Sequence, residues 1–98
     1  MGTQVLDLPD VEIVPQRETG SSLPWQVILY NDEHHTFEEV IHQLQKATGI
    51  SADAAFEIAM EVHTKGRSIC FTGTMQACER VMAILREIAL TVAIDRSG

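Results

Sequence analysis

The sequence is poor in basic residues. Seven Lys and Arg stand against 14 Asp and Glu, which gives a formal net charge of −7. Proteins that bind a nucleic-acid backbone cluster their Lys and Arg, and the few in this chain are scattered. The charge therefore argues against nucleic acid as a partner and favours basic or apolar ones.

Cysteines and long apolar runs are also scarce. Cys70 and Cys78 are too few for a disulfide framework and lack CxxC spacing, which predicts a reducing cytoplasm. No apolar run approaches the roughly 20 residues of a membrane helix, so a membrane span is excluded. Residues 1–15 carry acids and lack the apolar core of a secretory signal, so none is expected.

The length of 98 residues allows one domain with a single modest core. All three prolines and a Gly-Ser-Ser run fall within residues 1–24, which predicts a flexible N-terminal arm. Val11, Ile13 and Val14 indicate a short extended piece within that arm. We expect the folded core domain over residues 25–98.

Local signals divide this core into alternating strands and helices. The sequence WQVILY at residues 25–30 is rich in β-branched and aromatic residues and predicts a first strand. Thr36, with Glu39 three positions later, is a capping-box signature for a helix that Gly49 ends. Ser51 can cap a second helix, which is expected to close at Lys65-Gly66.

The remaining elements follow from the same kind of pattern. Residues 68–72 predict a second strand, Gly73-Thr74 a turn and cap, and residues 91–94 a third strand. The apolar stripes of the three helices are Phe37, Val40, Ile41 and Leu44; Ala55, Ile58, Ala59 and Val62; and Ala77, Val81, Ile84, Leu85 and Ile88. This order predicts an α+β two-layer sandwich, with three helices on one face of a three-stranded, mainly antiparallel sheet.

Two places carry polar groups suited to binding. The segment 31–37 places hydrogen-bond acceptors and imidazoles in a turn between an apolar strand and an apolar helix. The alternative is that Asn31 and Asp32 only cap their own backbone, as in Asx turns. His63, near the end of the second helix, is either a binding residue or a partner of the helix dipole.

Several motifs in residues 25–70 resemble the core of the ClpS adaptor family. In that family a strand leads into an Asn-Asp turn, an apolar helix ends in Leu-Gln-Lys, and a second helix ends in Val-His-x-x-Gly followed by Arg or Lys. This chain has Asn31-Asp32, Leu44-Gln45-Lys46 and Val62-His63-Thr64-Lys65-Gly66-Arg67 in that order without a gap. Matched motifs in one order and spacing are more specific than any single motif, and these cover about half of the chain.

The resemblance implies an adaptor that binds the N-terminal residue of N-degron substrate proteins, typically Phe, Leu, Tyr or Trp. The adaptor would deliver them to the N-terminal domain of a Clp AAA+ unfoldase for degradation. No cofactor, metal ion or covalent chemistry is implied, and the expected location is a bacterial cytoplasm or, second, a plastid stroma.

The resemblance also assigns roles to residues. Asn31, Asp32 and His63 would hold the free α-amino group, because an ammonium has three donors and needs acceptors in a shielded site. An apolar pocket for the side chain would consist of Phe37, Val40, Ala59 and Val62. Its rim would be formed by Glu33, His35 and Thr36.

The chain departs from the family pattern at several positions, among them the segment Asp32-Glu33-His34-His35-Thr36-Phe37, where the family commonly has Asp-Asp-Tyr-Thr-Pro-Met. Phe37 and Ala59 stand where methionine is common, which leaves the preference among N-terminal residues open. Gln76 and Val81 stand where many relatives use Glu and Lys to dock on the unfoldase, and Phe71 replaces a glycine. The docking surface or the partner is therefore expected to differ.

Three other functions compete with this interpretation. A metal site would draw on His34, His35, His42, His63 and the two cysteines, which lack HxxxH or CxxC spacing. An enzyme would use His63 as base, Asp32 to orient it, and Cys70 or Ser68 as nucleophile. A modulator would bind the unfoldase and block other substrates without reading N-termini, and it would tolerate substitution of His63.

Overall fold

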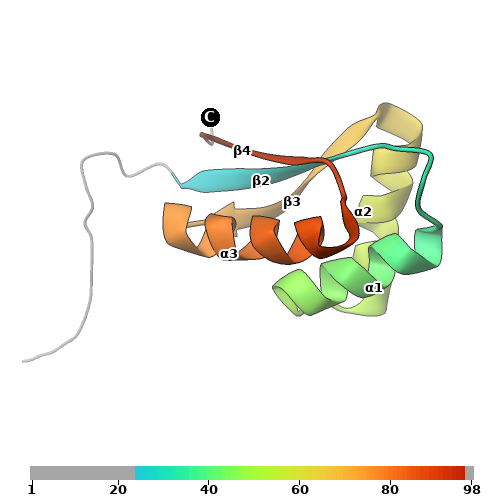
Figure 1. The fold of residues 1–98 in the computed structure, drawn as a ribbon, viewed down its shortest axis with the longest axis horizontal. Helices are drawn as coiled ribbons and strands as arrows, with labels where there is room; N and C mark the ends of the chain where they lie inside the picture. Colours follow the sequence, from blue (N-terminus) through green and yellow to red (C-terminus); the bar gives the residue numbers. More distant parts are fainter. Residues whose placement is uncertain (1–23, 97–98) are drawn as a thin grey trace, which may run out of the picture.

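The computed structural model describes residues 24–96. The predicted arm over residues 1–24 and its extended piece at Val11, Ile13 and Val14 lie outside that range, apart from Pro24. The described elements are β2 (Trp25–Tyr30), α1 (Phe37–Thr48), α2 (Ala52–Lys65), β3 (Arg67–Gly73), α3 (Met75–Leu85), the 3₁₀ turn η1 (Arg86–Ile88) and β4 (Val92–Arg96) (Figure 1). Their order confirms the predicted α+β fold, although the bounds of β3 and β4 differ by one or two residues from the prediction.

The sheet has β2 at its centre, with β3 and β4 antiparallel to it on either side. The register shifts between Val27, which pairs with Phe71, and Ile28, which pairs with Ile69. Cys70 is thus an extra residue in β3, as in a β-bulge, and it is buried in the core. The helices lie on one side of the sheet, and no helix within residues 24–96 covers its other face (Figure 1).

The core lies between the sheet and the helices. Helix α3 contacts all three strands, α2 packs on β3, and α1 packs on both other helices. Leu29, Leu44 and Leu85 are fully buried there. Of the apolar stripe predicted on α1, Leu44 alone is fully buried. Among the described residues, none of the helices has the length and apolar character that crossing a membrane requires.

The helix ends follow the predicted caps. The Glu39 N–H donates to Thr36 Oγ1, and the Thr36 N–H donates to the Glu39 carboxylate, which confirms the capping box. Ser51 caps α2 through its hydroxyl. Gly49 and Gly66 end α1 and α2 with φ of 77° and 92°, a left-handed conformation that favours glycine.

The prediction for the third helix was wrong at its end. The predicted stripe continued to Ile88, whereas α3 ends at Leu85 and a 3₁₀ turn follows. The buried Gln43 lies at this end of the helix, where its Nε2 donates to the Ile84 carbonyl at 2.6 Å. In a longer helix that carbonyl would accept from the Ile88 N–H. The buried residues of α3 are Cys78, Val81 and Leu85.

Candidate functional site

One pocket contains most of the predicted site residues. It lies where the loop after β2, the start of α1 and the end of α2 meet, and its volume is about 50 Å³. It is lined by Leu29, Tyr30, Asn31, Asp32, His35, Phe37, Val40, Ala59, Val62, His63 and Leu90. Eight of the ten predicted residues are therefore brought together, and the two others are Glu33 and Thr36.

Those two lie beside the pocket rather than in its lining. Glu33 is exposed in the loop, and Thr36 caps α1. Three lining residues, Leu29, Tyr30 and Leu90, were not predicted. Strand periodicity could have indicated Leu29, because in a strand its side chain points to the same side as that of Asn31, which also lines the pocket. No local signal marks Leu90.

The loop after β2 is tied to the end of α2. The Asn31 N–H donates to the Gly66 carbonyl at 2.9 Å, which places Asn31 beside the last turn of α2, where His63 lies. Both side chains line the pocket, and neither has a hydrogen-bond partner within residues 24–96. The Asn31 side-chain oxygen and a ring nitrogen of His63 are thus available to a ligand.

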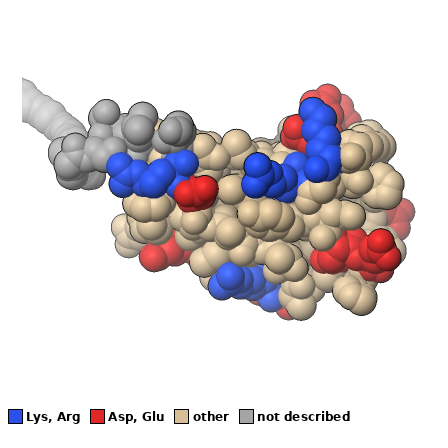
Figure 2. Space-filling view, turned by 90° about the horizontal axis from the view of Figure 1, so that it is seen from above, with Lys and Arg blue, Asp and Glu red and all other residues tan. Residues whose placement is uncertain are grey.

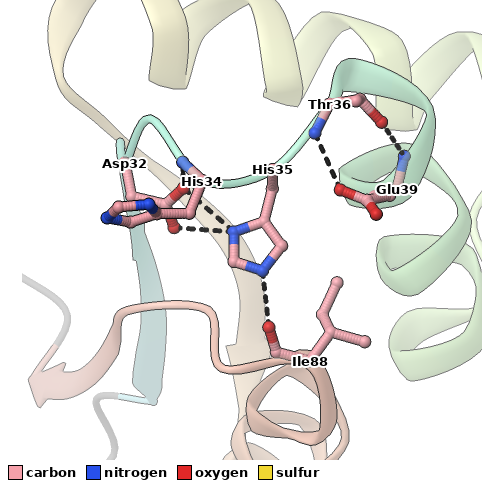
Figure 3. A network of polar contacts seen from close by, with 6 residues as sticks. All are labelled: Asp32, His34, His35, Thr36, Glu39 and Ile88. Carbon is pink, nitrogen blue, oxygen red and sulfur yellow. Dashed lines mark hydrogen bonds and ion pairs between the residues drawn. The ribbon is translucent and has the colours of Figure 1, made fainter.

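Asp32 is held by a network that reaches across the fold (Figure 3). One carboxylate oxygen accepts from the His34 N–H at 2.9 Å, and His35 Nδ1 lies 2.9 and 3.0 Å from the two oxygens. His35 Nε2 lies 2.5 Å from the Ile88 carbonyl oxygen. A carboxylate and a carbonyl both accept, so the two contacts are hydrogen bonds at the same time only when His35 is an imidazolium.

The same contacts shift both pKa values. The hydrogen bond to Asp32 raises the pKa of His35, and the Ile88 carbonyl adds to this effect against the opposing effect of burial. Burial by itself would raise the pKa of Asp32. The hydrogen bonds from His35 and from the His34 N–H, with the positive charge of His35, outweigh burial and lower that pKa. The contacts therefore favour the ionised form of both groups.

The rest of the pocket is apolar. Leu29, Ala59, Val62 and Leu90 are buried, and Phe37 and Val40 are partly buried. The Phe37 ring meets the His63 ring edge-on, with centroids 5.5 Å apart, and meets the Phe56 ring in the same way at 6.1 Å. Phe37 thus forms an aromatic wall between the apolar space and the acceptors.

The enzyme alternative is not assembled. Ser68 donates from Oγ to a Glu61 carboxylate oxygen, and neither Ser68 nor Cys70 lines the pocket that holds His63. Burial raises the pKa of Cys70 to about 12, whereas a nucleophilic thiol needs a lowered pKa. Within residues 24–96, no group of three or more His, Cys, Asp and Glu is placed to hold a metal ion.

Val81 lies in the core, in agreement with the apolar stripe predicted on the third helix. It is only 4% exposed and shares its face with the buried Cys78 and Leu85. Its side chain therefore cannot form part of a docking surface, whereas Gln76 is exposed on the same helix.

Comparison with known proteins agrees with the motifs and the fold. Residues 21–92 match the family described as "ATP-dependent Clp protease adaptor protein ClpS". The ATP-dependent Clp protease adapter protein ClpS of Corynebacterium glutamicum strain R is 28% identical over 93 residues, which cover 95% of this chain and 93% of that protein. The human E3 ubiquitin-protein ligase UBR2 is 35% identical over 80 residues, 81% of this chain but only 4% of that ligase.

A solved structure shares the fold. Agrobacterium tumefaciens ClpS2, solved bound to L-phenylalaninamide, superposes with a TM-score of 0.73 over 79% of this chain and 100% of that one. At 17% identity this likeness shows the fold alone. Since the family match spans residues 21–92, the chain belongs to the ClpS family of ATP-dependent Clp protease adaptors.

Proposed function

We propose that this chain is an adaptor that binds the free α-amino group and the bulky apolar side chain of N-degron proteins. It delivers them to a Clp AAA+ unfoldase. The observation that carries the proposal is the joining of polar acceptors and apolar walls in one small pocket. The ligand of the A. tumefaciens neighbour, L-phenylalaninamide, supports it, because that molecule has both a free amine and a phenyl ring.

The acceptors select a chain end. The Asn31 side-chain oxygen and a ring nitrogen of His63 accept from the ammonium, while Asp32 supplies negative charge close to it. Because His35 and the His34 N–H already occupy the Asp32 carboxylate, Asp32 acts mainly by charge or through a water molecule. An acetylated terminus lacks the charge and leaves the acceptors unsatisfied, which is why it is rejected.

The apolar walls select the side chain. A volume of about 50 Å³ has room for only a few water molecules, so a bulky side chain enters when the Phe37 ring rotates outward. Its burial stabilises the complex by roughly 1.5 to 3 kcal/mol. The small Ala59 leaves space behind Phe37 that a larger residue would fill. The rank order among Phe, Leu, Tyr and Trp follows from these two residues.

The test is fluorescence anisotropy with labelled peptides that begin with Phe, Leu, Trp or Val, beside an N-acetylated Phe peptide. We expect His63→Ala to weaken binding by about 10- to 150-fold, as loss of a hydrogen bond to a charged group does. His42→Ala is the matched control, because His42 is an exposed histidine on α1 outside the pocket. Equal binding of the free and acetylated peptides would contradict the proposal.

A modulator that blocks the unfoldase without reading N-termini remains the alternative outcome. It would bind the unfoldase N-terminal domain and none of the peptides. We further propose that residues 25–98 suffice to bind cargo, in the cytoplasm of a bacterium such as those of the Corynebacterium relatives. Residues 1–24 serve delivery, so deleting residues 1–17 should slow degradation of a Phe-initiated substrate while its binding is unchanged.

A further inference from the structure

We propose that His35 is a positioning residue, which as an imidazolium clamps the Asp32 carboxylate and the loop after β2 to the Ile88 carbonyl. The effect of this clamp on cargo rests on the proposed function. The clamp itself does not, because it exists in the protein without cargo. The clamp consists of the contacts of His35 with Asp32 and Ile88.

The clamp joins two segments that are 53 positions apart in the sequence. At either end of the loop the backbone is fixed, since the Asn31 N–H donates to Gly66 and the Thr36 N–H donates to Glu39. Between these points His35 points inward to η1, as Figure 3 shows. An imidazolium suits this place because its two N–H groups point in different directions from one rigid ring.

The clamp affects both halves of the pocket. On one side it fixes Asp32, which lines the polar part. On the other side it fixes Ile88, two residues before Leu90, which lines the apolar part. Breaking the clamp would therefore loosen an acceptor and a wall at the same time. His35 and Asp32 are 12% and 15% exposed, so water screens their contact little.

The groups around His35 favour its charged form. Asp32 contacts it from the loop, Glu39 acts on it from α1, and the Ile88 carbonyl accepts from it at η1. Tyr30 and His63 line the same pocket from β2 and α2. At η1 the charge of Glu87 is engaged elsewhere, by the side chains of Gln43 and Lys46. Two carboxylates thus act on His35 and one histidine lies across the pocket.

The clamp depends on pH in a defined direction. A neutral imidazole has one N–H, so above the folded pKa of His35 either the Asp32 or the Ile88 hydrogen bond is lost. Since that pKa is raised, the clamp is closed at lower pH and opens as pH rises through the folded value. It also fails in acid, once Asp32 is protonated below its own lowered pKa.

The first test uses the full chain without cargo. A ¹⁵N NMR titration of the histidine rings should show both His35 nitrogens protonated at neutral pH and a pKa above about 6.5. Asp32→Asn should lower the pKa of His35 and leave the ring signals of the exposed His42 in place. A neutral His35 ring at pH 6, or no response to Asp32→Asn, would overturn the clamp.

The second test measures cargo binding. His35→Gln should weaken binding of a Phe-initiated peptide about tenfold near pH 6, and the ratio to wild type should approach one as the pH rises to about 9. The titration of the peptide amine affects both proteins and cancels in this ratio. His34→Gln is the matched control, because His34 is the exposed neighbour that hydrogen-bonds to Asp32 through its backbone N–H rather than its ring.

The outcomes separate the clamp from the proposed function. A ratio near one at every pH, in a His35→Gln protein with native circular dichroism, would overturn the positioning role. If this variant fails to fold, the His35→Asn protein replaces it and should show the same pH-dependent ratio. If wild-type protein binds no peptide, the proposed function fails and the positioning role with it, while the NMR titration still decides whether the clamp exists.

Discussion

The pocket and the outer groove of the sheet differ in size and in kind. The outer groove, on the face away from α3, has a volume of about 470 Å³, against about 50 Å³ for the pocket. It is lined by Gln26, Ile28, Glu61, Lys65, Arg67, Ser68, Ile69 and Asp95. Figure 2 shows Lys and Arg in separate groups rather than as one basic patch on the face seen there. The larger hollow thus mixes charges of both signs with exposed apolar atoms.

The two places also differ in how their side chains are held. In the pocket, Asn31 is fixed to Gly66 and His35 to Ile88, while Asp32 is held by His35 within the same loop. In the outer groove, Lys65 and Glu61 form an exposed ion pair at 3.7 Å, a kind of contact that stabilises little. The binding site is therefore distinguished by positioned acceptors that lie beside an apolar lining, and not by its volume.

Filling the pocket with a larger side chain should have the largest effect on peptide binding. Ala59→Met adds a flexible side chain to a space of about 50 Å³, and overpacking of this kind costs about 1 to 3 kcal/mol. We expect binding of Phe- and Trp-initiated peptides to weaken by about 5- to 150-fold in anisotropy. Ala83→Met, at an exposed position of α3, is the matched control.

A compensating change sharpens this prediction. Adding Phe37→Met to Ala59→Met restores the methionine pair common in the family and removes the aromatic wall. The double variant should recover most of the lost binding, so the two changes should not be additive. Additive losses would show that Phe37 and Ala59 do not share one space, and the pocket would then be wrongly placed.

Breaking the Asp32–His35 pair should have a smaller effect, which is on the stability of the fold as well as on binding. Because the pKa of Asp32 is lowered, the stability that Asp32 contributes is lost as pH falls through its pKa in the folded state. Because the pKa of His35 is raised, the stability that His35 contributes is lost as pH rises through its pKa in the folded state. Asp32→Asn should lower the free energy of unfolding in urea by about 1 kcal/mol near neutral pH and flatten this profile.

Asp95 supplies the control from the outer groove. Its carboxylate accepts from the Arg96 N–H at 2.8 Å, much as Asp32 accepts from His34, but no histidine pairs with it. Asp95→Asn should therefore leave the pH profile unchanged. If both substitutions alter the profile equally, backbone capping rather than the histidine pair is responsible.

The sequence predicted what depends on neighbours along the chain. The caps at Thr36 and Ser51, the glycine stops and the first strand follow from local patterns, and the structure has them where expected. The family motifs placed Asn31 and His63 in one site by resemblance, and the structure brings the two together in one pocket.

Contacts between distant segments were not predictable in this way. His35 was predicted on the pocket rim, but nothing near it in the sequence indicates that its Nε2 contacts the Ile88 carbonyl oxygen. Likewise, Gln43 stands in the sequence as one polar residue of an amphipathic helix, yet it is buried and donates to the Ile84 carbonyl. Both contacts have one cause, because a buried polar group needs a partner that only the tertiary fold supplies.

Ile69→Ser should have the smallest effect, and it tests whether the outer groove takes part in binding. Ile69 is 52% exposed in the outer groove, so its replacement should change the free energy of unfolding by less than about 0.5 kcal/mol. Peptide affinity should stay within about twofold of wild type, because this side chain lies on the sheet face away from the pocket. A clear loss of affinity would mean that cargo beyond its first residue crosses the outer face. The outer groove would then be part of the binding surface. Positioned acceptors would no longer distinguish the pocket from the outer groove.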